Sequence, residues 1–281
     1  MSRVWNIVLG VVGWGLLLAY LVVAARYCSG RQEARVVRQV RVVVRDSARQ
    51  RVITPGMVRG WLEREGIRTK DMPLAEVDLR RIRELVTGRG YVRDAKVYTD
   101  FDGVLHIELS QRHPVARVNT YNGYNFYITD DGYILPLQPH EVLYVPVITG
   151  SFTPPFSRTY VGPLSEALPE AQKKSSENYR FFRKLINFVK FIERDDFWRA
   201  QIVQIQVFES PAPQGDPAWQ EPQVEFVPRA GDHVVGLGPL DDVEAKLAKL
   251  LDFYRDALAY EGWDGPKYIN LKFRNQVICT K

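Results

Sequence analysis

Residues 91–116 read YVRDAKVYTDFDGVLHIELSQRHPVA, and this stretch predicts a β-hairpin. Asp102-Gly103, near its middle, is one of the strongest short-range signals for a tight hairpin turn. After the turn, Leu105, Ile107 and Leu109 alternate with polar residues, as in a strand with one buried face. The stretch therefore predicts two paired strands joined by a short turn.

One strand and two helices are predicted before this hairpin. Thr54-Pro55 starts the first helix, because threonine is a good N-cap and proline suits the first helical position, and Gly66 marks its end. The second helix covers residues from about 74 to 87. Residues 36–44 are rich in valine and predict a strand, although arginines at three- and four-residue steps leave a helix as an alternative there. The predicted order is strand, helix, helix, strand, strand.

This order, together with the phrases Tyr91-Val92, Ala95-Lys96-Val97, Leu105-His106-Ile107 and RHPVA at 112–116, resembles a POTRA domain of FtsQ/DivIB cell-division proteins. The family often has an acidic residue before the arginine of its closing motif, where this chain has Gln111. The resemblance implies a POTRA-like domain over residues 36–112. Such domains bind polypeptides, often through strand edges. The alternative is a spacer that holds the rest of the chain away from a membrane.

Residues 113–281 predict a β-rich domain with flanking helices. FYITDDGYIL at 126–135 predicts another hairpin, and VPVITG at 145–150 predicts a strand. This order again resembles the β domain that follows POTRA in FtsQ. Further predicted elements are an amphipathic helix over 179–192 with a core-facing aromatic stripe, strands over 202–208, 224–227 and 233–237, and a helix from Asp241 to about 260. The predicted fold class is α+β.

The chain closes with KYINLKFRNQVIC at 267–279, which predicts a final strand region. In FtsQ proteins a strand of the form Y-[IV]-D-L-R-[YF] ends the β domain, and Asn270 and Lys272 replace its aspartate and arginine here. The resemblance implies that this region pairs with a strand of the partner FtsB, with Phe273 at the place of a contacting aromatic. The implied partner-binding residues are Tyr268, Asn270, Lys272, Phe273, Asn275 and Val277. The alternative is that Phe273 is an ordinary core or edge aromatic.

The N-terminal region predicts a membrane span. Residues 4–25 form an uncharged run of 22 residues, which at about 1.5 Å per residue covers roughly 33 Å and can cross a bilayer. A cleaved signal peptide is the alternative, although its apolar region is usually shorter, roughly 7–15 residues. Residues 1–3 would then form a cytoplasmic tail and residues 26–35 a basic juxtamembrane linker.

The net charge of +5 is unevenly distributed. Residues 26–112 hold 19 lysines and arginines against 12 acidic residues, which favours an anionic membrane surface over nucleic acid as the electrostatic partner. A solubilising linker is the alternative. Basic residues after the span would by themselves place the large domains in the cytoplasm, but long domains translocate largely regardless of charge. The resemblance implies a single-pass bacterial inner-membrane protein with a cytoplasmic N-terminus and periplasmic domains, at the division septum.

No pattern of catalytic or metal-binding residues is present in the sequence. The four histidines, His106, His113, His140 and His233, fall in separate segments without ligand spacing. There is no GxSxG or SxxK motif and no phosphate-binding glycine loop. Turns and helix caps explain the paired acids, such as Asp130-Asp131, better than catalysis does. We therefore predict no catalytic residue, no cofactor and no metal site.

These observations and the resemblance together predict a non-enzymatic divisome scaffold. It would bind FtsB and FtsL and, through them, the septal peptidoglycan synthesis machinery, with no small-molecule substrate and no nucleic acid. The main alternative is a POTRA-type chaperone or secretion component that binds exported polypeptides. A membrane-tethered cell-wall enzyme is a third hypothesis, which the absent motifs disfavour.

Overall fold

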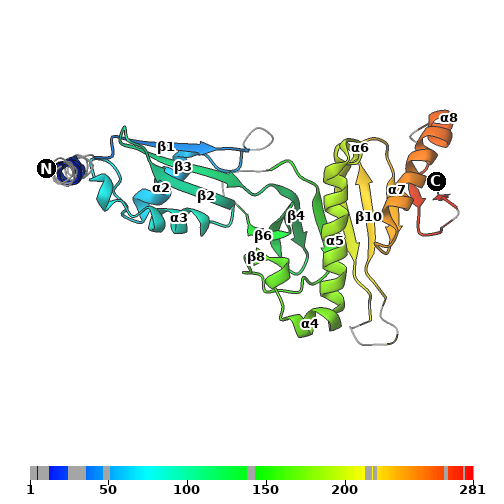
Figure 1. Ribbon diagram of the computed structural model, residues 1–281. Helices are drawn as coiled ribbons and strands as arrows, with labels where there is room; N and C mark the ends of the chain where they lie inside the picture. The colour runs from blue at the N-terminus through cyan, green and yellow to red at the C-terminus, as the bar shows by residue number, and fades with distance from the viewer. Residues whose placement is uncertain are drawn as a thin grey trace. The chain divides into compact units, whose positions relative to one another are not determined.

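A computed structural model describes residue 5 and residues 13–24, 36–46, 51–137, 143–212, 217, 220–262, 265–274 and 276–280 (Figure 1). The chain divides into two compact units, Met1–Gln111 and Arg112–Lys281. Of the predicted span 4–25, the structure describes residue 5 and a helical stretch at 13–24. Within the described residues, no helix combines the length and the apolar character that a bilayer crossing requires. The predicted tail 1–3 and linker 26–35 lie outside the described residues.

The first unit has a three-stranded sheet with helices packed on it. Its elements are β1 (Gln39–Val44), α2 (Pro55–Arg64), η1 (Leu74–Glu76), α3 (Leu79–Thr87), β2 (Val92–Thr99) and β3 (Val104–Gln111). The strand order is β1-β3-β2, with β1 parallel and β2 antiparallel to β3. The predicted order of strand, helix, helix, strand, strand is confirmed, and residues 39–44 form a strand and not a helix.

Local capping chemistry sets the helix boundaries of this unit. The Thr54 side chain accepts a hydrogen bond from the Met57 N–H at 3.3 Å, and Pro55 begins α2, as predicted. The prediction of one helix from residue 74 is wrong at its start. Asp78 caps the Arg81 N–H at 2.8 Å, so α3 begins only at Leu79, after the separate turn η1. The turn at Asp102-Gly103 is confirmed, with Gly103 at a φ of +81°.

The core of the first unit lies between the sheet and the two helices. Leu105, Ile107 and Leu109 of β3 are fully buried, in the alternation that the sequence predicts. Beside them, the fully buried amide of Gln111 accepts hydrogen bonds from the N–H groups of Val52 and Ile53, at 3.1 and 3.0 Å. Gln111 therefore fastens the segment before α2 to the end of β3.

The second unit is built on one ten-stranded sheet. Its strands are β4 (Pro114–Thr120), β5 (Asn125–Thr129), β6 (Tyr133–Pro136), β7 (Val147–Ser151), β8 (Gly162–Pro163), β9 (Ile202–Phe208), β10 (Gln223–Pro228), β11 (Val234–Gly238), β12 (Tyr268–Asn270) and β13 (Ile278–Thr280). They lie in the order β13-β12-β11-β10-β9-β7-β4-β5-β6-β8. Parallel pairs are β4–β7, β7–β9 and β11–β12, and the other neighbouring strands are antiparallel.

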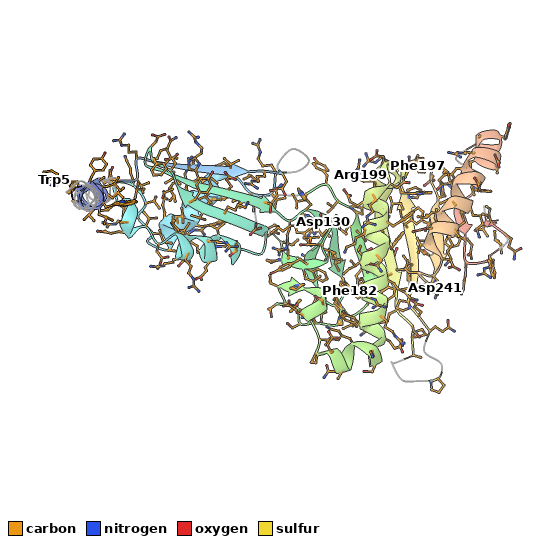
Figure 2. The ribbon with its side chains drawn as sticks, in the orientation of Figure 1. Trp5, Asp130, Phe182, Phe197, Arg199 and Asp241 are labelled. Atoms are coloured by element: carbon orange, nitrogen blue, oxygen red, sulfur yellow. The ribbon has the colours of Figure 1, made fainter. Side chains whose placement is uncertain are left out.

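The second unit also contains helices and helical turns. They are η2 (Leu164–Glu166), α4 (Glu170–Ser175), α5 (Glu177–Arg194), α6 (Asp196–Gln201), α7 (Val243–Phe253), the π-helical turn η3 (Tyr254–Leu258) and α8 (Ala259–Glu261). Figure 1 shows α5 lying along the sheet and α7 near its C-terminal edge. Phe182 of α5, labelled in Figure 2, packs among Phe126, Phe152 and Phe156, with its ring centroid 5.4 Å from that of Phe156. The predicted role of the α5 aromatic stripe as a core face is confirmed.

Two predictions for the second unit are wrong in detail. Asp241 does not cap α7, because its carboxylate binds Lys184, and Asp242 stands at the N-cap position. The C-terminal region is not one strand over residues 268–279. It is a hairpin of two short strands, β12 and β13, joined by residues 271–277.

Candidate functional site

The C-terminal edge of the second sheet is the candidate site, because the predicted partner-binding residues gather there. Tyr268 and Asn270 lie in β12. Lys272, Phe273 and Val277 lie in the loop that connects β12 to β13. The remaining predicted residue, Asn275, lies outside the described residues.

Tyr268 is anchored to the sheet and is only half-buried. Its hydroxyl group donates to Oε1 of Glu225 on β10 at 2.7 Å, across the intervening strand β11. Burial and this hydrogen bond to a carboxylate both raise the pKa of the phenol, so Tyr268 stays neutral at physiological pH. The geometry gives Tyr268 a structural role at the edge, besides any contact with a partner.

Asn270 ends β12 by forming a local turn. Its side-chain Oδ1 accepts a hydrogen bond from the Lys272 N–H at 2.9 Å. Asparagine and aspartate side chains commonly bond to the main chain two residues further on and so start a turn. This bond explains why the strand stops at Asn270 and the chain folds back toward β13.

Lys249 of α7 fastens the loop between the two strands. Its ammonium group donates to the carbonyl oxygens of Leu271 at 3.4 Å, Phe273 and Gln276 at 3.3 Å. Partial burial lowers the pKa of Lys249. No local motif in the sequence marks this lysine, because the carbonyls that it binds are more than twenty residues away along the chain.

Around this anchored loop, several side chains remain accessible. Phe273 is 43 % exposed and Ile278 is 40 % exposed. Val277 is half-buried and packs against the core, whereas Lys272 is exposed. An accessible aromatic residue beside a strand edge is a feature that protein-binding surfaces use.

A buried polar pair lies behind the edge. The Nε2 atom of His233, just before β11, is 2.9 Å from the hydroxyl of Tyr254 in η3. Burial lowers the pKa of His233, and its Nδ1 atom has no hydrogen-bond partner within the described structure. His233 is therefore a neutral core residue next to the last strands.

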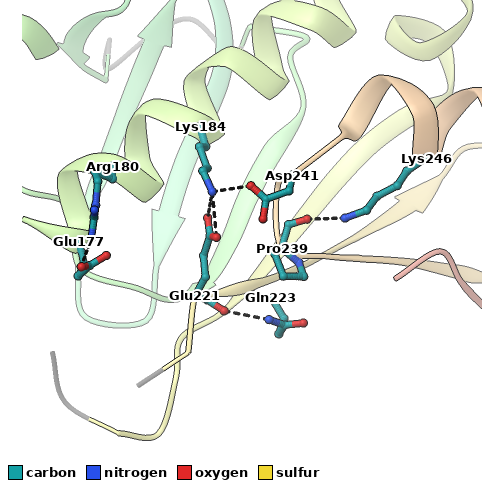
Figure 3. A network of polar contacts seen from close by, with 8 residues as sticks. All are labelled: Glu177, Arg180, Lys184, Glu221, Gln223, Pro239, Asp241 and Lys246. Carbon is teal, nitrogen blue, oxygen red and sulfur yellow. Dashed lines mark hydrogen bonds and ion pairs between the residues drawn. The ribbon is translucent and has the colours of Figure 1, made fainter. Parts of the chain in front are cut away.

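A second polar cluster joins α5 to the sheet (Figure 3). Lys184 of α5 binds the Glu221 carboxylate at 2.8 and 2.9 Å and Asp241 at 2.7 Å. Partial burial opposes the charge of Lys184, but the two carboxylates outweigh it and raise its pKa. Lys246 of α7 donates to the carbonyls of Leu237 and Pro239. A hollow of about 550 Å³ beside this cluster is lined by residues that include Lys184, Phe188, Phe191, Leu240, Asp242 and Val243.

The first unit also has strand edges at which another strand could pair. β1 and β2 are the outer strands of its sheet. Part of the β2 edge is already covered, because Arg83 of α3 donates to the carbonyl of Ala95 at 3.0 Å. An incoming strand would have to displace this side chain to pair along the whole of β2.

The His, Cys, Asp and Glu side chains of the described residues are dispersed. Among them, no three His, Cys, Asp or Glu side chains are grouped so as to hold a metal ion. His106 pairs with Asp100 at 2.8 Å and His233 with Tyr254, while His140 lies outside the described residues. In the second unit, the feature best suited to binding a partner is therefore the strand edge with the loop that Lys249 holds.

Comparison with known protein families assigns a description to each unit. Residues 35–110 match the POTRA-like domain family. Residues 113–280 match the family described as FtsQ/DivIB, C-terminal related. The fold is thus a mixed α+β fold with a POTRA-like domain followed by a β-rich domain. A comparison with individual characterised proteins found no match.

Proposed function

Because this chain belongs to the FtsQ/DivIB family, whose domains suggest a scaffold role in cell division, we propose that it is a non-enzymatic divisome scaffold. It binds FtsB and FtsL and links them to the septal peptidoglycan synthesis machinery. The observation that supports this most directly is that both family matches occur in one chain, in the order POTRA-like domain and then β domain.

The proposed partner-binding surface is the C-terminal hairpin. Main-chain groups of a sheet edge supply affinity in recognition by strand addition, and side chains next to the edge supply specificity. Phe273 is suited to the second task, because it is exposed and its main chain is held by Lys249. Tyr268, Asn270, Lys272, Asn275 and Val277 complete the proposed contact region.

The proposed location is the bacterial inner membrane at the division septum. Residues 4–25 would span the membrane, with residues 1–3 in the cytoplasm and both domains in the periplasm. The support is the 22-residue uncharged run and the family relationship. Protease added to intact spheroplasts should degrade the second unit, and full protection of that unit would contradict the topology.

Depletion of the protein in its host tests the scaffold role itself. A fluorescent fusion that folds in the periplasm should form a band at midcell, and depleted cells should grow as filaments. Normal septation with a diffuse envelope signal would contradict the division role and support a chaperone of exported polypeptides.

A point substitution tests the binding surface. Phe273→Glu should weaken co-purification of FtsB by at least roughly tenfold, because it places a charge where an aromatic contact is expected. The matched control is Tyr144→Glu, at a fully exposed aromatic outside the hairpin, which should bind as the wild type does. Binding of FtsB by the Phe273→Glu variant equal to that of the wild type, with unchanged thermal unfolding, would show that Phe273 is not part of the binding surface.

A further inference from the structure

β13, at the edge of the described sheet, covers β12, where a partner strand is expected. β12 and β13 face each other in three antiparallel pairs: Tyr268–Thr280, Ile269–Cys279 and Asn270–Ile278. In the described structure the sheet therefore ends at β13 and not at β12. A partner strand that pairs with β12 must take the place that β13 holds.

The main chain of β12 shows which groups that strand would use. On the inner side, the Lys267 carbonyl accepts from the Val234 N–H at 2.9 Å, and the Leu271 N–H donates to the Gly236 carbonyl at 2.8 Å. Successive residues of a strand direct their main-chain groups to opposite edges. The N–H and C=O groups of residues 268 and 270 therefore point away from β11, toward β13.

β13 contributes main-chain hydrogen bonds to the sheet but no buried side chain. All three of its residues are exposed. An incoming strand would remake the same main-chain hydrogen bonds with β12, so the bonds lost and gained nearly cancel. The side-chain contacts of the incoming strand then decide which strand occupies the edge of β12.

The loop before β13 is held by contacts that do not involve β13. Lys249 binds three of its carbonyl oxygens, and Val277 packs against the core. Release of β13 therefore leaves β12, the loop and Phe273 where they are. The point at which the chain can open lies between Val277 and Ile278.

The charge around this edge favours an acidic partner. Residues 265–280 contain Lys272, Arg274 and Lys267, which already pairs with Asp232 at 2.5 Å, and no acidic residue. Lys272 is exposed, and the Arg274 side chain is 90 % exposed, 3.7 Å from Asp242. Positive groups beside a binding edge steer and select negatively charged segments.

We infer that β13 is a replaceable strand that closes β12 in the unbound protein, and that an extended, acidic segment of the partner displaces it and pairs antiparallel to β12. This inference rests on the proposed function, because the partner is the division protein that binds the C-terminal hairpin. It adds that binding requires release of β13.

A reversible lock on β13 tests the inference in the full-length protein. Ile269→Cys, combined with Cys28→Ser, places a cysteine directly opposite the native Cys279. Opposite Cα atoms in a non-hydrogen-bonded antiparallel pair are about 4.5 Å apart, which lies within the range of a disulfide. The oxidised protein should bind the periplasmic part of FtsB at least about tenfold more weakly than the reduced protein.

A truncation after Val277 gives the opposite prediction. Without the competing strand, binding of the same FtsB fragment should tighten by about tenfold. Equal binding by the oxidised and reduced lock would overturn the inference and leave the proposed function standing. Failure of the wild-type protein to bind FtsB at all would overturn both.

Discussion

The ring of Tyr268 on β12 lies so close over Gly236 on β11 that a Cβ atom on residue 236 would stand 2.1 Å from the tyrosine hydroxyl oxygen. From there the hydroxyl group reaches Glu225 on β10. One side chain thus spans three neighbouring strands, and the missing side chain of the glycine makes room for it. This contact fixes the position of β12, the strand to which the C-terminal hairpin is attached.

Gly236→Ala should destabilise the second unit by about 1–3 kcal/mol, because the new methyl group must displace the Tyr268 ring. Urea unfolding measures the change in the free energy of unfolding. In a Tyr268→Ala background the same substitution should cost much less, because the ring is absent. Equal costs in the two backgrounds would show that the ring and the glycine are not coupled.

The buried histidine should make stability depend on pH. Burial lowers the pKa of His233 below its usual value of 6.5 in the folded protein. Below pH 6.5 the unfolded chain therefore binds more protons at this residue than the folded chain does. The stabilising contribution is fully present above that pH and is lost as the pH falls toward the folded-state pKa.

His233→Gln should flatten this dependence. We expect the free energy of unfolding to fall less steeply between about pH 7 and about pH 5 in the variant than in the wild type. Urea titrations at a series of pH values provide the comparison. Parallel profiles would mean that His233 does not titrate on unfolding.

Gln111 should contribute more to the stability of the first unit than its neighbour Ser110 does. Gln111→Leu leaves the buried N–H groups of Val52 and Ile53 without their acceptor, and each such group costs about 1–3 kcal/mol. We expect a loss of about 2–4 kcal/mol in the free energy of unfolding of this unit. Ser110→Ala, one residue earlier at a half-buried site, is the control and should change stability little.

The Lys184 cluster should contribute little to the free energy of unfolding despite its three short contacts. The side chains of Lys184, Glu221 and Asp241 are 37 %, 22 % and 60 % exposed, so solvent screens their attraction. We expect Lys184→Met to change the free energy of unfolding by less than about 1 kcal/mol, with the change shrinking in high salt. A loss of several kcal/mol that is insensitive to salt would contradict this.

Elements with a local signal could be predicted from the sequence. The Asp102-Gly103 turn, the Thr54 cap and the alternation of Leu105, Ile107 and Leu109 all act within a few residues, and the structure confirms each. The errors occurred where two local signals competed. Asp78 capped a helix that begins at Leu79, five residues later than expected, and Asp242 took the position expected of Asp241.

The candidate site was less accessible to sequence reasoning. The stretch 267–279 predicts a strand by composition, but the Asn270 side chain stops β12 after three residues. That Asn270 can form such a turn is visible in the sequence. Which lysine then holds the loop is not, since Lys249 lies on a helix that packs beside it only in the folded protein.

The amino-acid sequence by itself determined the order of strands and helices in the first unit, the mixed α+β class and the family resemblance, because turns, caps and apolar periodicity depend on near neighbours. The tertiary structure alone decided that β13 closes β12, that Gly236 must make room for Tyr268, and that Lys249 binds the loop. Those contacts join residues far apart along the chain. They depend on strand pairing and packing, which no local pattern encodes.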